Sequence, residues 1–79
     1  MYSRTILEAA MRSRAVSVIL AHNHPHGLAV PSNADLAATE SVCHALAAAK
    51  IRLLDHFIFA GQDYISLRDS GFIRVEGGV

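Results

Sequence analysis

The 79-residue sequence has one cysteine, no tryptophan, two prolines and no long hydrophobic run. The single Cys43 excludes an internal disulfide and is compatible with a reducing cytoplasm. No apolar stretch reaches the roughly 20 residues that a transmembrane helix needs. Met1 leads into Arg4 and Glu8, whereas a signal peptide would continue into an apolar segment. We therefore expect a cytoplasmic protein that does not enter a membrane.

An excess of charge of either sign is also missing. Seven Lys and Arg residues balance seven Asp and Glu residues, so bulk charge attracts neither nucleic acid nor anionic membranes. The sequence has no basic stripe and no aromatic stacking platform of the kind that binds nucleic acid. The composition, 52% hydrophobic and 18% charged, is globular. At this length we expect one domain over residues 1–79, near the size at which a single core is marginal.

Hydrophobic periodicity predicts two main helices and about three strands. Residues 3–14 carry apolar side chains at helical spacing, and residues 33–50 form a second, alanine-rich helix. The runs 16–21 and 51–60 are predicted strands, apolar enough to be covered on both faces. Residues 61–63 are a predicted hairpin turn, after which 64–67 return as a third strand. The predicted fold class is α/β, with a small mixed sheet.

Candidate metal ligands follow the first predicted strand. Alternate strand residues share a face, so His22 and His24 project together, and Pro25 stops the strand. After a short loop that contains Gly27, the chain can bring Asp35 close to the two histidines. Two imidazoles and one carboxylate, with a position open for water, are the ligand set of a catalytic zinc site. The set also accepts other divalent ions.

The same residues have a purely structural interpretation. Ser32 is a plausible N-cap of the second helix, and Asp35 three residues later completes a capping box. Asp35 therefore serves the helix, a metal ion or both. A histidine near a strand end is often simply solvated or hydrogen-bonded.

The spacing His-x-His, seven residues, Ser, two residues, Asp resembles the JAMM (MPN+) metallopeptidase signature in every position. The runs AHNHPHGLAVPSNAD and RLLDHFIFAGQDYISLRDSGFI resemble the C-terminal domain of RadC-family proteins over nearly the whole chain. The resemblance implies JAMM/MPN-like, cytidine-deaminase-like layering and a zinc-dependent hydrolase of peptide or isopeptide bonds. Ser32 would be catalytic, donating a hydrogen bond to the oxyanion. RadC-family proteins also carry a DNA-repair label.

The sequence departs from these families in two places. His26 stands where RadC relatives usually have serine, and it either competes for metal or lies in solvent. JAMM enzymes also use an upstream glutamate as general base, whereas Glu8 is the only acidic residue before His22. We therefore expect an N-terminally incomplete domain, either a fragment of a longer protein or a degenerate copy. In JAMM enzymes this glutamate lies on a first hairpin, which the resemblance implies is absent here. The sheet edge that such a hairpin would cover predicts a homo-oligomer.

Asp55 and His56 are adjacent polar residues in the otherwise apolar second strand, so they face opposite sides of it. An imidazole that binds a metal usually donates a hydrogen bond from its second ring nitrogen to an acceptor. Asp55 or His56 is a candidate for such a partner of the metal ligands. The alternative is a polar pair with local hydrogen bonds. Two functions remain open: a JAMM-type zinc hydrolase, and a non-catalytic metal-stabilised interaction module linked to DNA repair.

Overall fold

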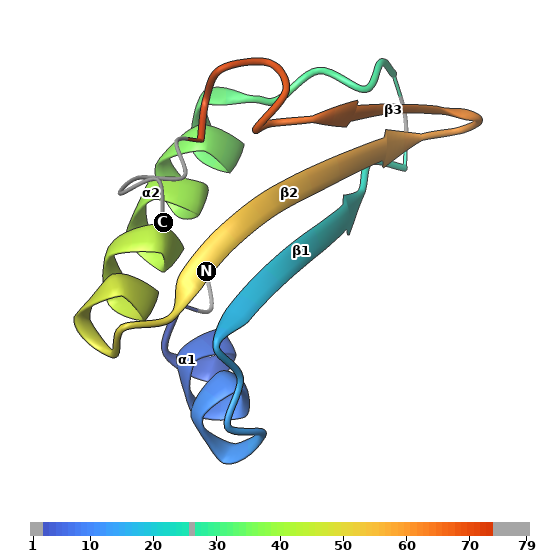
Figure 1. Ribbon diagram of the computed structural model, residues 1–79. Coiled ribbons are helices and arrows are strands. Elements are labelled where there is room, and N and C mark those ends of the chain that lie inside the picture. The colour runs from blue at the N-terminus through green and yellow to red at the C-terminus, as the bar shows by residue number, and fades with distance from the viewer. Residues whose placement is uncertain (1–2, 26, 74–79) are drawn as a thin grey trace.

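The computed structural model describes residues 3–25 and 27–73. One sheet with strand order β1-β2-β3 pairs β1 with β2 in parallel and β2 with β3 antiparallel. Figure 1 shows the helix α2 beside this curved sheet and α1 at one end of it. The elements in chain order are α1 (Ser3–Arg12), β1 (Ser17–Asn23), α2 (Asn33–Ala48), β2 (Arg52–Ala60) and β3 (Asp63–Ser66). The predicted α/β fold with a small mixed sheet and two helices is confirmed.

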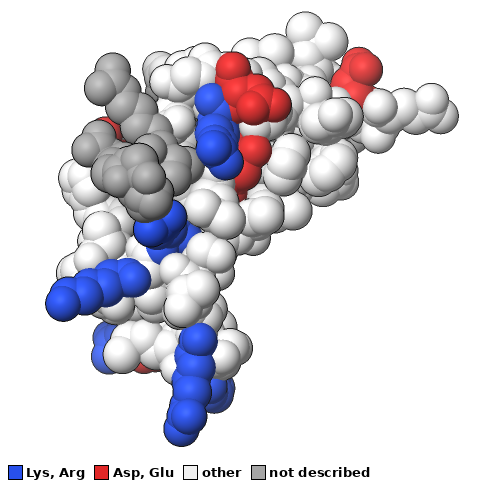
Figure 2. Space-filling view, in the orientation of Figure 1, with Lys and Arg blue, Asp and Glu red and all other residues white. Residues whose placement is uncertain are grey.

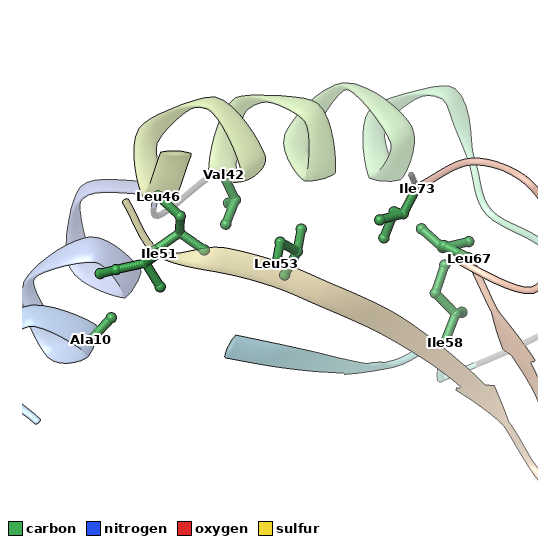
Figure 3. Close-up of a cluster of buried hydrophobic side chains, with 8 residues drawn as sticks. All are labelled: Ala10, Val42, Leu46, Ile51, Leu53, Ile58, Leu67 and Ile73. Carbon is green, nitrogen blue, oxygen red and sulfur yellow. The ribbon is translucent and has the colours of Figure 1, made fainter. Parts of the chain in front are cut away.

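The core lies between α2 and the sheet. Parallel strands need a crossover connection, and α2 is the crossover from β1 to β2. Its Val42 and Leu46 are fully buried, as is Ile58 of β2. Figure 3 shows the buried apolar cluster, with Ala10 joining it from α1. The cluster consists of Ala10, Val42, Leu46, Ile51, Leu53, Ile58, Leu67 and Ile73.

Strand β2 contains one extra residue relative to β1. Val18 pairs with Leu53 and the next residue, Ile19, pairs with Asp55, so Leu54 has no partner of its own in β1. Such a bulge shifts the alternation of side chains by one position. As a result, Leu53 and His56 both face α2, and Asp55 faces the other side of the sheet.

The face of the sheet away from α2 is covered at Asp55 and Ser66, which are buried, but is open elsewhere among the residues that the structure describes. The side chains of Ile19 and Tyr64 are 58% and 63% exposed. The rings of Phe57, Phe59 and Tyr64 lie against one another, with centroids 5.9–6.3 Å apart. The prediction that the first two strands are covered on both faces is therefore wrong at Ile19 and Phe59, which are exposed, because the described helices pack on one face only.

Both helices end two residues before the predicted boundaries because a non-glycine residue takes a left-handed conformation. Arg14 has φ 55° and Lys50 has φ 61°. After each, a backbone N–H reaches back into the last helical turn: Ala15 donates to Ala10, and Ile51 donates to Leu46, both at 2.9 Å. This is the Schellman arrangement, in which the chain leaves the helix axis.

The hairpin between β2 and β3 is one residue tighter than predicted. Ala60 pairs directly with Asp63, so only Gly61 and Gln62 form the turn. Gly61 has φ 61°, which two-residue hairpin turns with glycine in the first position require. The third strand therefore runs from Asp63 to Ser66 instead of 64–67.

The molecule has principal extents of 34 × 27 × 20 Å. On the face shown in Figure 2, most Lys and Arg side chains lie toward the α1 end, and the acidic side chains lie mainly toward the β3 end. None of the described helices is both long and apolar enough to cross a membrane.

Candidate metal centre

Strand β1 and its continuation position the histidine pair. His22 lies on β1 opposite Ile58 of β2, and His24 follows the strand directly. The backbone N–H of His24 donates to the carbonyl of Phe59 at 2.7 Å, which holds this segment against β2 beyond the strand end. The two imidazole rings lie 5.0 Å apart, centroid to centroid, and perpendicular to each other. The side chains thus project to one side, as two-residue spacing on a strand requires.

The first turn of α2 brings a carboxylate to these rings. Ser32 is the N-cap, and its Oγ accepts from the N–H of Asp35 at 3.0 Å. The N–H of Ser32 in turn donates to Oδ2 of Asp35 at 2.8 Å. The predicted capping box is therefore confirmed. The same Oδ2 lies 2.9 Å from Nε2 of His24, and Oδ1 lies 3.9 Å from Nε2 of His22.

The three side chains fit a divalent metal ion. One ligand atom from each of His22, His24 and Asp35 lies within 4.8 Å of the others. Metal–ligand distances of about 2.0–2.2 Å in a tetrahedral zinc site place neighbouring ligands roughly 3.3–3.6 Å apart. The separations of 2.9 and 3.9 Å between Asp35 and the two imidazoles lie on either side of that range. The His22 side chain is 47% exposed, which leaves the centre open to solvent on that side.

The environment of Asp35 keeps its carboxyl ionised. Partial burial opposes ionisation, but the hydrogen bonds from the backbone and side chain of Ser32 and from His24 outweigh it. The pKa of Asp35 is therefore below its ordinary value. An anionic carboxylate beside two imidazole nitrogens is a donor set suited to zinc.

A third histidine, His56, lies beside His22. His56 is buried, its ring centroid lies 6.3 Å from that of His22, and the two rings are nearly perpendicular. Its Nδ1 lies 2.7 Å from Oγ1 of Thr39 on α2. Burial, followed by the nearby His22, lowers the pKa of His56 below its ordinary value, so its imidazole is neutral at neutral pH.

Asp55 is directed away from the metal ligands. Its carboxylate accepts from the hydroxyl of Ser66, from the N–H of His56 at 2.7 Å and from the N–H of Arg68 at 3.0 Å. Burial opposes ionisation here too, but these three hydrogen bonds, helped by the charge of Arg68, lower the pKa of Asp55. Of the two adjacent polar residues, His56 therefore lies beside the candidate centre, and Asp55 ties β2 to the segment after β3.

The other sequence candidates have the following positions. Ser32 is exposed, and its hydroxyl oxygen is the acceptor in the cap, beside the Asp35 carboxylate. Glu8 lies on α1, where its Oε2 is 3.5 Å from Nε of Arg4 and its side chain is 60% exposed. His26 lies outside the described residues. Thr39 was not singled out from the sequence, although its four-residue spacing from Asp35 places both on one helix face.

Comparison with known proteins assigns the family. The family model described as "RadC-like JAB domain" matches residues 1–72. A "UPF0758 protein" of Tolumonas auensis is 42% identical over 72 residues, which are 91% of this chain and 32% of that protein. A "UPF0758 protein" of Bordetella petrii is 46% identical with the same coverage. The chain thus spans about a third of the length of the curated relatives it matches. With this match over nearly its whole length, the chain belongs to the RadC-like JAB domain family.

Proposed function

We propose that this chain is a zinc-dependent, JAMM-type hydrolase domain that cleaves a peptide or isopeptide bond. The observation that carries the proposal is the convergence of His22 and His24 from β1 with Asp35 from α2, their ligand atoms all within 4.8 Å. Two imidazoles and one carboxylate leave a fourth tetrahedral position free, as catalytic zinc sites require.

Each residue of the centre has a distinct part in this chemistry. Zinc held by His22, His24 and Asp35 would polarise the amide carbonyl and lower the pKa of water. The capping box fixes Asp35 in the orientation in which its carboxylate meets the imidazoles. Ser32 donates its hydroxyl proton in a hydrogen bond to the oxyanion that develops on the carbonyl oxygen.

Amide hydrolysis also needs a general base for the proton of the attacking water. Glu8, the acidic residue that precedes the histidine pair, lies on α1 in a surface ion pair with Arg4. The proposal therefore takes the base from a carboxylate outside the described cluster, supplied by a second copy of the chain.

Zinc content and cleavage together test the proposal. We expect one zinc ion per chain in the purified protein and cleavage of internally quenched peptides or of a lysine isopeptide substrate. His22→Ala removes both, whereas His44→Ala, a change of an exposed histidine on α2, removes neither. Absence of bound zinc in the wild-type protein overturns the proposal.

The open apolar face of the sheet favours a second function, a non-catalytic, metal-stabilised interaction module. Ile19 and Tyr64 are more than half exposed there, and exposed apolar patches of this kind mark interaction sites. Stoichiometric zinc without turnover of either substrate class supports this function over hydrolysis.

A further inference from the structure

A continuous chain of hydrogen bonds joins the first turn of α2 to the middle of the sheet. Oγ1 of Thr39 donates to the backbone carbonyl of Asp35 at 2.7 Å. The same Oγ1 lies 2.7 Å from Nδ1 of His56 on β2. Thr39 and His56 are 4% and 3% exposed, so water does not compete for these contacts.

The geometry assigns the direction of each hydrogen bond. A threonine hydroxyl has one proton, and a carbonyl oxygen has none to give. Two oxygens at 2.7 Å therefore require that the Thr39 proton lies between them, as is common for a helical threonine and the carbonyl four residues back. The Thr39 oxygen must then accept from His56, which places a proton on Nδ1 of the His56 ring.

This chain joins α2, which carries Asp35, to β2, the strand that pairs with the histidine-bearing strand β1. Asp35 belongs to the first turn of α2, and His56 pairs with Leu20 on β1, two residues before His22. His56 and His22 are therefore neighbours on the same face of adjacent strands, and their rings pack edge to face at 6.3 Å. The bonds of Thr39 thus fix how far the carboxylate of α2 lies from the imidazoles of β1.

We propose that Thr39 and His56 are positioning residues for the metal centre, which hold the Asp35 turn at the separation from His22 and His24 that a shared ion needs. The inference rests on the proposed metal-dependent function. Because neither residue belongs to the ligand cluster itself, they act through Asp35 and His22. Partners of this kind typically change metal affinity about 10- to 100-fold when they are removed.

Four variants of the same chain test this role with cobalt(II) and zinc as probes. Thr39→Val has nearly the same shape but no hydroxyl, and we expect about 10-fold weaker binding of both ions and altered visible absorption of bound cobalt. Thr39→Ser restores the hydroxyl and returns affinity to within about 3-fold of wild type. His56→Asn retains a donor near the Nδ1 position and keeps more affinity than His56→Leu, which has none.

Ser41→Ala is the matched control, because it also removes a hydroxyl from α2 but at a position away from the metal ligands. Ser41 is exposed, and its Oγ lies 3.0 Å from Oγ of Ser3 on α1. Circular dichroism confirms that each variant is folded at the temperature of the titration. Equal affinities of Thr39→Val and Ser41→Ala overturn the inference and leave the proposed function standing.

A readout without metal separates the two proposals. Absence of metal binding by the wild-type chain refutes the proposed function, and the positioning role is then judged from imidazole nitrogen NMR of the metal-free protein. We expect the Nδ1-protonated form of His56, and a shift of the His24 signals in Thr39→Val that Thr39→Ser reverses. A His56 ring protonated on Nε2 alone overturns the inference.

Discussion

Replacing Asp35 by alanine tests whether one carboxylate stabilises both the helix start and the histidine segment. Its side chain is 14% exposed, accepts from the N–H of Ser32 at 2.8 Å and lies 2.9 Å from Nε2 of His24. A hydrogen bond to a charged group contributes about 1.5–3 kcal/mol, and a negative charge in a first helical turn adds about 0.3–1 kcal/mol. Allowing for solvent, we expect Asp35→Ala to lower the free energy of unfolding by about 2–3 kcal/mol in metal-free protein.

Two comparison variants separate the loss of the Asp35 contacts from the loss of the N-cap alone and from the removal of any acidic side chain on α2. Ser32→Ala removes only the N-cap side chain and is expected to cost about 1 kcal/mol. Glu40→Ala changes an exposed acid on the same helix and is expected to remain within about 0.5 kcal/mol of wild type. Thermal unfolding measures all three, since 1 kcal/mol shifts the midpoint of a domain of this size by roughly 4–8 °C.

The pH dependence follows from the lowered pKa of Asp35. A folded pKa below the unfolded value of about 3.9 stabilises the protein above that pH, and this contribution is lost as the pH falls through the folded pKa. The difference between wild type and Asp35→Ala should therefore narrow below about pH 4. An Asp35→Ala midpoint equal to that of Glu40→Ala at neutral pH, or a difference unchanged by acid, refutes the reasoning.

Further outcomes follow from other parts of the structure. Zinc at about 100 times its dissociation constant should stabilise the wild-type protein by about 2.7 kcal/mol, and His22→Ala should abolish this gain in thermal unfolding. Asp55→Asn should cost about 1–2 kcal/mol at neutral pH and, because the folded pKa of Asp55 is lowered, flatten the fall of stability below about pH 4; an unchanged acid transition contradicts this. Lys50→Gly should stabilise by about 0.5–1 kcal/mol in urea unfolding, since glycine adopts the left-handed conformation without strain; a lower midpoint argues against it. Sedimentation should show a dimer or larger assembly, because β1 pairs on one side only among the described residues, whereas a monomer at high concentration disproves that expectation.

The candidate centre was predictable from sequence because its parts are local. The face shared by His22 and His24 follows from strand alternation, and the Ser32–Asp35 capping box follows from a four-residue pattern at a helix start. The short loop between them predicted that the two parts meet, and the family resemblance supported that prediction. The structure places them together through the crossover from β1 to α2.

The features that the sequence did not reveal depend on distant packing or on rare backbone conformations. The contact between Thr39 and His56 joins residues 17 apart and exists only because α2 packs on one particular face of β2. The left-handed residues that follow the two helices, Arg14 and Lys50, are not glycine, which is the usual sequence signal for such a cap. The apolar content of β1 and β2 indicated burial, but composition does not identify which neighbour covers each face.

The unpaired Leu54 decides which chemistry the strand presents to the metal ligands. In an unbroken strand, Leu53 on the α2 side would bring Asp55 to that side and turn His56 outward, since side chains alternate. Because the bulge takes Leu54 out of this alternation, His56 lies on the α2 side and Asp55 on the other. A neutral imidazole, and not a negative carboxylate, therefore lies beside His22. The bulge at Leu54 thus sets which of the two polar side chains faces α2 and His22: if Leu54 instead paired with β1 in regular alternation, the faces of Asp55 and His56 would be exchanged.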